Sequence, residues 1–157
     1  MKINKTNALR ALDTAKIPYT IHTFDSKTAL SAVEVATAIT EPPAKIYKTL
    51  VTAGKSGAHY VFVIPGAAEL DLKKAARLAD EKSIAMLPSK DLLKLTGYVH
   101  GGCSPVGMKT LFTTYIDASA SSLPTFIVSA GKIGLQMELD PQSLAKLIKA
   151  SFGEVTA

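Results

Sequence analysis

Residues 101–107 have the sequence Gly-Gly-Cys-Ser-Pro-Val-Gly, which places three glycines, a serine and a proline within seven residues. Glycine permits positive φ angles and the close approach of another group, whereas Pro105 fixes one φ angle and removes one N–H donor. Such a loop is shaped and poor in side chains, and its N–H groups can hold an ester carbonyl, a ribose hydroxyl or a phosphate. The alternative, for the loop taken alone, is a tight connection between two strands.

The composition fits one domain over residues 1–157, because a chain of 157 residues that is 47% hydrophobic can bury a sizeable core. No apolar run approaches the roughly 18 residues that cross a bilayer, and the first residues lack the apolar run of a signal peptide. Cys103 is the only cysteine, which excludes an intrachain disulfide and a thiolate metal cluster. We expect a cytoplasmic protein with no membrane partner.

The net charge of +5 comes from 18 Lys and Arg residues against 13 Asp and Glu residues. This excess favours polyanionic partners such as RNA. Only Arg10 and Arg77 are arginines, however, and no arginine-rich or aromatic nucleic-acid-binding motif is present. The charge is therefore compatible with an RNA partner without requiring one, and no DNA partner is expected.

Apolar spacing and capping signals, including Ser89 as an N-cap, predict helices over residues 7–15, 31–39, 70–78, 89–97 and 140–148. Alternating or apolar runs predict strands over residues 19–24, 46–52, 60–64, 84–87, 111–116, 125–129 and 135–139. These elements lack the regular β-α-β order of a doubly wound sheet. We therefore expect an α+β fold, with a mixed, mostly antiparallel, barrel-like sheet and flanking helices.

Lys48 is a candidate binding residue within the strand predicted over residues 46–52. Period-two alternation places it on the same face as Ile46 and Leu50. A lysine between apolar neighbours lies at a sheet edge, where it discourages aggregation, or points into a cleft as a cation for an anionic or carbonyl-bearing ligand. A second small-residue loop, residues 129–134, is either a plain hairpin turn or a partner of the 101–107 loop at one mouth of the sheet.

The histidines do not form a metal-ligand pattern, because His22, His59 and His100 are far apart in the sequence, and no metal site is expected. His22 alternates with strand residues and is interpreted as a satisfied core or rim histidine, whereas His100 is a candidate donor at a pocket rim. Cys103 and Ser104 are weak candidates for a nucleophile. Ser104 lacks a Gly-x-Ser-x-Gly elbow, and Cys103 has no basic partner beyond a sequence neighbour.

Three segments together resemble the YbaK/EbsC family in order and spacing: residues 46–50, 101–107 and 129–135. Residues 70–74 (Leu-Asp-Leu-Lys-Lys) and 96–98 (Thr-Gly-Tyr) are also similar to that family, and the likeness covers about residues 5–153. The resemblance implies a single-domain aminoacyl-tRNA deacylase that hydrolyses mischarged Cys-tRNA(Pro), and also Cys-tRNA(Cys), in trans after prolyl-tRNA synthetase has erred. It implies a mixed β-barrel related to the editing domain of prolyl-tRNA synthetases, with no metal or organic cofactor.

The same resemblance implies roles for particular residues. Lys48 positions the terminal adenosine or the ester, Gly101 and Gly102 supply backbone donors, and the nucleophile is the thiol of the substrate itself. The other substrate-binding positions that it implies are Phe24, Thr49, Ser104, Pro105, Ser129, Gly131 and Gln136. The implied partners are the acceptor end of tRNA(Pro) and a prolyl-tRNA synthetase that hands over the substrate.

Three positions depart from the family pattern, since Phe24 stands where relatives often carry tyrosine, Ile133 where they carry arginine, and Gln136 where they carry an acidic residue. These changes remove polar or charged groups near the implied pocket and bear on its amino acid specificity. Two other functions therefore stay open. One is a related deacylase for alanine or serine, in which water attacks, and the other is a binding protein that grips aminoacyl-tRNA or a synthetase without turnover.

Overall fold

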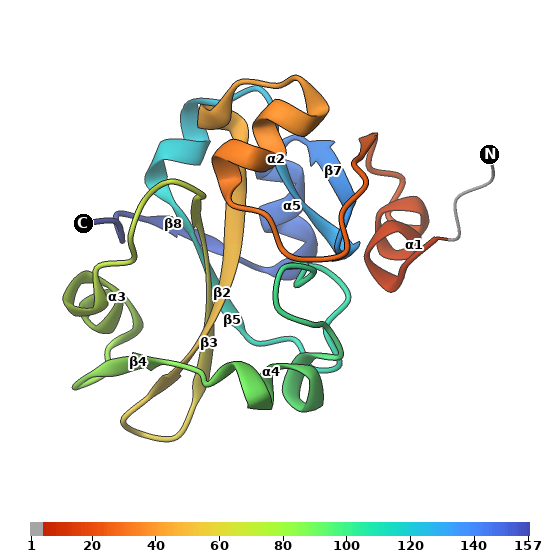
Figure 1. The fold of residues 1–157 in the computed structure, drawn as a ribbon. Coiled ribbons are helices and arrows are strands. Elements are labelled where there is room, and N and C mark those ends of the chain that lie inside the picture. Colours follow the sequence, from red (N-terminus) through yellow and green to blue (C-terminus); the bar gives the residue numbers. More distant parts are fainter. Residues whose placement is uncertain (1–4) are drawn as a thin grey trace.

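The computed structural model describes residues 5–157 (Figure 1). Its helices are α1 (Asn7–Thr14), α2 (Ala32–Ile39), α3 (Leu72–Ala79), α4 (Ser89–Thr96) and α5 (Pro141–Ile148), with 3-10 turns η1 (Pro43–Lys45) and η2 (Ala118–Ser122). Its strands are β1 (Thr20–Thr23), β2 (Tyr47–Gly54), β3 (His59–Pro65), β4 (Ile84–Met86), β5 (Thr113–Asp117), β6 (Phe126–Lys132), β7 (Leu135–Leu139) and β8 (Ser151–Gly153). Within residues 5–157, no helix has the length and apolar character needed to cross a bilayer.

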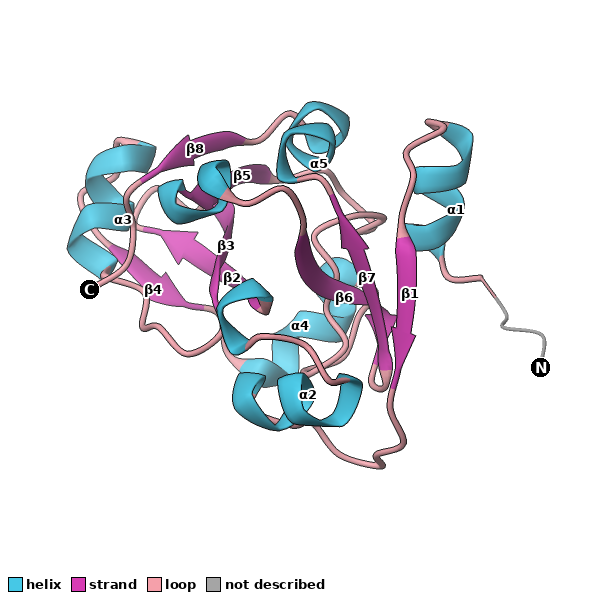
Figure 2. Cartoon of the chain, turned by 90° about the horizontal axis from the view of Figure 1, so that it is seen from above, coloured by secondary structure: helices cyan, strands magenta, loops and turns pink. Residues whose placement is uncertain are grey.

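The strands form two sheets, with the orders β4-β2-β3-β5-β8 and β1-β7-β6. All neighbouring strands run antiparallel except the pairs β3–β5 and β5–β8. An isolated parallel bridge between Ile46 and Ile127 joins the sheets, and Figure 2 shows the two sheets facing each other with helices around them. The expected mixed, mostly antiparallel sheet with flanking helices is confirmed, and it resembles a barrel only loosely because the two sheets do not close into one.

Local capping rules account for most helix ends. The Ser31 hydroxyl accepts from the Glu34 N–H while the Glu34 carboxylate accepts from the Ser31 N–H, so the predicted capping box is formed. Asp140 caps α5 with Pro141 behind it, and Gly97 ends α4 at a φ of 87°. The prediction for Ser89 was wrong, because Ser89 is the first residue of α4 and its side chain caps nothing.

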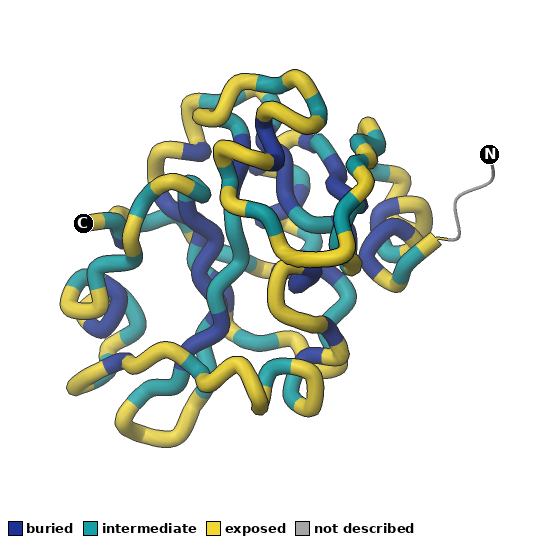
Figure 3. Tube along the Cα trace, viewed as in Figure 1, coloured by how far each residue is buried: buried dark blue, intermediate teal, exposed yellow. Residues whose placement is uncertain are grey.

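The buried residues form one large cluster and three smaller ones. In the large cluster, α1 and α5 pack on one face of β6 and β7, through residues that include Leu9, Met137 and Leu144. Helix α3 packs on the β2–β3 hairpin, and α2 covers Ile46 and Ile127 where the sheets meet. Buried segments run through both sheets (Figure 3). The large cluster joins Tyr47, Val63 and Ile116 of one sheet to residues of β6 and β7 in the other, so the two sheets share a core.

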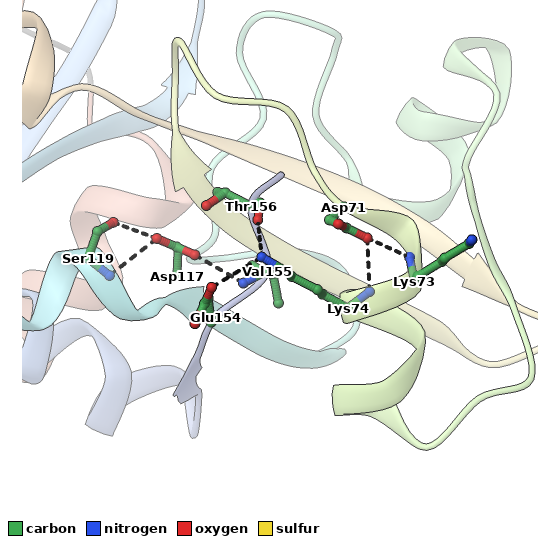
Figure 4. A network of polar contacts seen from close by, with 8 residues as sticks. All are labelled: Asp71, Lys73, Lys74, Asp117, Ser119, Glu154, Val155 and Thr156. Atoms are coloured by element: carbon green, nitrogen blue, oxygen red, sulfur yellow. Dashed lines mark hydrogen bonds and ion pairs between the residues drawn. The ribbon is translucent and has the colours of Figure 1, made fainter.

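The C-terminal strand β8, which the sequence did not predict, pairs with β5, and the residues that follow it are held by polar contacts (Figure 4). The buried carboxylate of Asp117 accepts from the Val155 N–H at 3.1 Å, and Lys74 donates to the Thr156 carbonyl at 2.9 Å. Ser119, which donates to the same Asp117 carboxylate, also lies 2.7 Å from the Tyr47 hydroxyl. The C-terminus therefore supports the start of β2, one residue before Lys48.

Candidate active site

A cavity of about 350 Å³ lies where the two sheets diverge from the Ile46–Ile127 bridge. Its volume is within the range of small-molecule sites. One wall is β2, the opposite wall comes from β6 and β7, and α2 and α4 contribute to the sides. The apolar lining consists mainly of Phe24, Ala29, Leu30, Val35, Ile46, Leu50 and Leu92. The polar lining is Ser31, Tyr47, Lys48, Thr49, His100, Cys103, Ser129 and Gln136, with Gly101 beside them.

An open strand edge forms the β2 wall of this cavity. Consecutive residues from Ile46 to Leu50 line it, although alternate residues of a strand point to opposite faces. The Val51 carbonyl accepts from the Leu87 N–H at 3.0 Å, on the side of β2 where β4 lies. Thr49, two residues earlier, directs its N–H and C=O to that same side, where no strand of residues 5–157 pairs with it. Its hydroxyl is also buried without a hydrogen-bond partner in the described chain.

The two alternatives for Lys48 therefore coincide, because the unpaired edge is itself the wall of the cleft. Lys48 is half-buried, and its ammonium makes no ion pair with any carboxylate of residues 5–157. Across the cavity lie Ser129 on β6 and Gln136 on β7, which face each other in the strand register. The site thus combines one cation with hydroxyl, amide and backbone groups.

The 101–107 loop closes one end of the cavity and meets the β6–β7 hairpin, as the alternative for the 129–134 loop predicted. Gly101 has a φ of +85°, and a Cβ there would lie 2.4 Å from the Ala29 Cβ. A Cβ on Gly102 would lie 2.9 Å from both the Ile133 nitrogen and the Lys132 Cα. Each position therefore requires glycine, and the two loops pack backbone against backbone.

The loop connects α4 to β5, so its interpretation as a strand-to-strand connection was wrong. Residues 102–106 hold the loop in shape through hydrogen bonds to neighbouring residues. The Gly102 N–H donates to the Val99 carbonyl at 3.0 Å and is not directed to a ligand, and Gly102 is outside the cavity lining. The Ser104 hydroxyl accepts from the Val106 N–H at 3.2 Å, and the Tyr98 hydroxyl donates to the Val106 carbonyl at 2.6 Å.

Three further positions expected in the pocket lie outside it. Ser104 is completely buried, and Pro105 lines a separate cavity behind the loop. A Cβ on Gly131 would approach Tyr98 and Thr6 at 3.0 and 3.2 Å, so Gly131 faces away from Lys48. The chain turns over residues 99–102, and residues that are close in sequence on this loop line different cavities. The structure thus brings together Lys48, Thr49, Phe24, Gly101, Ser129 and Gln136.

Cys103 lines the cavity, but its thiol is not activated. The residue is buried, and this burial raises the pKa of the thiol to about 12, although a hydrogen bond with Thr96 acts in the opposite direction. A thiol with that pKa is almost entirely protonated at pH 7, whereas the thiolate is the nucleophile. His100 is exposed at the cavity rim, as predicted for a rim donor.

A network of charged groups lies beside the cavity, on the β7 face that carries Gln136. His22 Nε2 is 2.8 Å from a Glu138 oxygen and 3.8 Å from Glu41, and Lys45 donates to the other Glu138 oxygen. Burial acts to raise the pKa of Glu138, but hydrogen bonds from Lys45, Thr125 and His22 and the charge of Lys45 outweigh it and hold this pKa at about 2. His22 is satisfied, as predicted. A ring nitrogen of His22 and carboxylate oxygens of Glu41 and Glu138, which are atoms of the kind that bind metal ions, lie within 4.8 Å of one another. The positive charge beside Glu138 is the ammonium group of Lys45.

The aminoacyl-tRNA editing domain is the family whose sequence model matches residues 26–147, a span that includes every residue lining the cavity except Phe24. The chain belongs to this family. EbsC of Enterococcus faecalis, described as a Cys-tRNA(Pro)/Cys-tRNA(Cys) deacylase, is 46% identical over 97% of this chain and 93% of its own length. A proline–tRNA ligase of Fervidobacterium nodosum is 31% identical over 62% of this chain, which corresponds to 17% of the ligase.

Solved structures agree with this assignment to the editing-domain family. A crystal structure described as a trans-editing enzyme for prolyl-tRNA synthetase matches with a TM-score of 0.84 and 27% identity, over 99% of both chains. A hypothetical protein of 21% identity matches with a TM-score of 0.89 over 97% of this chain and 100% of its own, which shows the shared fold.

Sequence reasoning missed part of the editing-domain pocket. Ala29 and Leu30 line it from the segment that leads into α2, Val35 lines it from α2 itself, and Leu92 lines it from α4. The capping box at Ser31 predicted the start of α2, but nothing local indicated which side of that helix faces the cavity. Gly101 was the one sequence signal for this wall, because a glycine in a shaped loop indicates that another segment packs closely against it. In the structure that segment contains Ala29.

Proposed function

We propose that this chain hydrolyses the ester of mischarged Cys-tRNA(Pro), and of Cys-tRNA(Cys), acting in trans. The observation that carries the proposal is a cavity with a cation, Lys48, and exposed backbone groups but without an activated protein nucleophile. A site of this kind suits a substrate that brings its own nucleophile, and cysteine does so. The 46% identity with EbsC, whose description is that of such a deacylase, supports the same activity.

In the proposed reaction the substrate thiol attacks its own ester carbonyl. A C–S bond forms, the C–O bond to the terminal ribose breaks, and the thiol proton passes to the departing ribose oxygen. The products are a free tRNA end and a cysteine thiolactone, which water then opens. The protein holds the ester bent so that sulfur and carbonyl carbon are in contact, and stabilises the charge that develops on the carbonyl oxygen.

The cavity offers suitable groups for both tasks. Lys48 and the N–H of Thr49 lie on one wall, and Gly101 lies at the end where a bulkier residue would collide with Ala29. We assign Lys48 and these backbone donors to the ester and the terminal ribose, and Phe24, Ser129 and Gln136 to the aminoacyl group. Gly102, Ser104, Pro105 and Gly131 act indirectly by shaping the loops.

We further propose tRNA(Pro) and prolyl-tRNA synthetase as partners. The similarity to part of a proline–tRNA ligase and to a trans-editing enzyme for prolyl-tRNA synthetase supports this pairing. The net charge of +5 includes few arginines, which predicts weak affinity for tRNA alone. A synthetase that hands over its product would offset that weakness. Equal deacylation rates with and without the synthetase, at limiting protein, would contradict the handover.

The test of the activity is steady-state hydrolysis of Cys-tRNA(Pro), Ala-tRNA(Pro) and Ser-tRNA(Pro) by purified protein. We expect only the cysteinyl ester to be cleaved well above its spontaneous rate. Cleavage of the alanyl or seryl ester would instead indicate a deacylase in which water attacks. Tight binding without cleavage of any ester would indicate a binding protein.

A further inference from the structure

The cavity has an unusual charge for a site that would hold an aminoacyl ester. An aminoacyl ester carries an α-amino group, which is an ammonium ion below its pKa of roughly 7.7–8.0. Of the cavity-lining residues in the described chain, none is Asp or Glu, and Lys48 brings a positive charge. An ammonium ion in this cavity would lose water, meet a like charge and find no counter-ion.

Charged groups on the neighbouring elements do not supply that counter-ion. Glu138 shares a strand face with Gln136, but both of its oxygens are engaged, by His22 on one side and by Lys45 and Thr125 on the other. Glu41 lies beyond His22, and neither glutamate lines the cavity. His100 at the rim adds positive charge when it is protonated.

Two cavity-lining residues carry polar side-chain groups that are suited to an uncharged amine. Gln136 is 6% exposed, and its side-chain amide makes no hydrogen bond with residues 5–157. The Thr49 hydroxyl is buried without a partner in the described chain. An amide oxygen accepts from an amine N–H, and a hydroxyl donates to an amine lone pair, which an ammonium ion lacks. A neutral amine therefore matches the hydrogen-bonding capacity of both groups.

We propose that this pocket selects the uncharged form of the substrate's α-amino group, with Gln136 and Thr49 as the specificity-determining residues. The inference rests on the proposed function, since it names the state in which the aminoacyl end is bound. The amino group does not react when the substrate thiol attacks the ester, so it contributes only to binding. Esters whose amino group is blocked and uncharged are consequently ligands of the same pocket.

The test uses a stable analogue, a tRNA acceptor minihelix that ends in seryl 3′-amino-3′-deoxyadenosine, in which an amide replaces the ester. Its N-acetyl form is the reference. The ionisable groups of the protein and of the minihelix are the same with both analogues, and only the amine is absent from the acetylated one. Calorimetric Kd values for both are measured from pH 8.5 to 6.5. We expect the Kd ratio of free-amine to acetylated analogue to rise by about 20-fold as the pH falls, following the loss of the neutral amine.

The Gln136→Glu variant adds the missing counter-ion and should abolish or reverse that rise, whereas Gln142→Glu, the same change on the exposed surface of α5, should not alter it. If the Kd ratio of the unsubstituted protein does not change with pH, the inference is overturned and the proposed function stays intact. This outcome does not depend on the folding of any variant. Failure of both analogues to bind more tightly than the bare minihelix would overturn both.

Discussion

Replacing Glu138 by glutamine should destabilise the protein in a manner that depends on pH. Glu138 joins three segments that meet beside the cavity, because it binds His22 on β1, Lys45 before β2 and Thr125 before β6. Glutamine keeps the size of the side chain but loses its charge. The change therefore isolates the electrostatic part of the contact between the two sheets.

The magnitude follows from the pKa of Glu138, which is held at about 2 in the folded protein against an ordinary value of 4.5. A lowering of about 2.5 units corresponds to about 3 kcal/mol. Because the folded pKa is the lower one, this stabilisation is fully present above pH 4.5 and is lost as the pH falls toward 2. The free energy of unfolding of the Gln variant should thus lie about 3 kcal/mol below that of the unaltered protein at pH 7, and close to it at pH 2.

Urea unfolding of both proteins at several pH values between 7 and 2 measures this difference directly. Other carboxylates titrate in both proteins and cancel in the comparison. Glu154→Gln is the matched control, since Glu154 pairs with Lys74 at the surface with its side chain 77% exposed, and should cost little at either pH. A destabilisation by Glu138→Gln that is the same at pH 7 and pH 2 would refute the electrostatic account.

Three other substitutions test the site. Lys48→Ala should lower kcat/KM for Cys-tRNA(Pro) by about 100-fold or more in steady-state assays, with little change in Tm, because the ammonium makes no ion pair in the described chain. Cys103→Ala should keep kcat/KM within about threefold, and a loss as large as that of Lys48→Ala would restore the protein thiol as a candidate nucleophile. Gly102→Ala should destabilise the fold by about 1–3 kcal/mol in urea unfolding, because the new methyl group meets backbone atoms of Lys132 and Ile133; an unchanged midpoint would contradict that contact.

Local rules made much of the fold predictable from sequence. The capping box at Ser31, the Asp140–Pro141 start of α5 and the glycine end of α4 depend only on residues within one helical turn. Such signals survive in a single sequence because the groups that they satisfy are adjacent. Ser89 shows the limit of these rules, since a serine before an apolar run can begin a helix without capping it.

The site was predictable only in part, because its geometry depends on long-range register. Gly101 and Pro105 are four residues apart yet line different cavities, and between them Gly102 packs on the β6–β7 hairpin. The exposed edge at Thr49 depends on where β4 begins to pair with β2. The Glu138 network likewise requires β1 and β7 to pair in the register that sets His22 opposite Gln136. No local pattern encodes these alignments.

The measurement that tests the central claim most directly compares Cys-tRNA(Pro) with its S-methyl form under single-turnover conditions. The two esters differ only in whether the substrate sulfur can act as a nucleophile. If the pocket works by holding the ester for attack by the substrate thiol, the cysteinyl ester is cleaved rapidly and the S-methyl ester remains at its spontaneous rate. Equal cleavage of both esters would contradict the account and assign the attack to water or to a group of the protein.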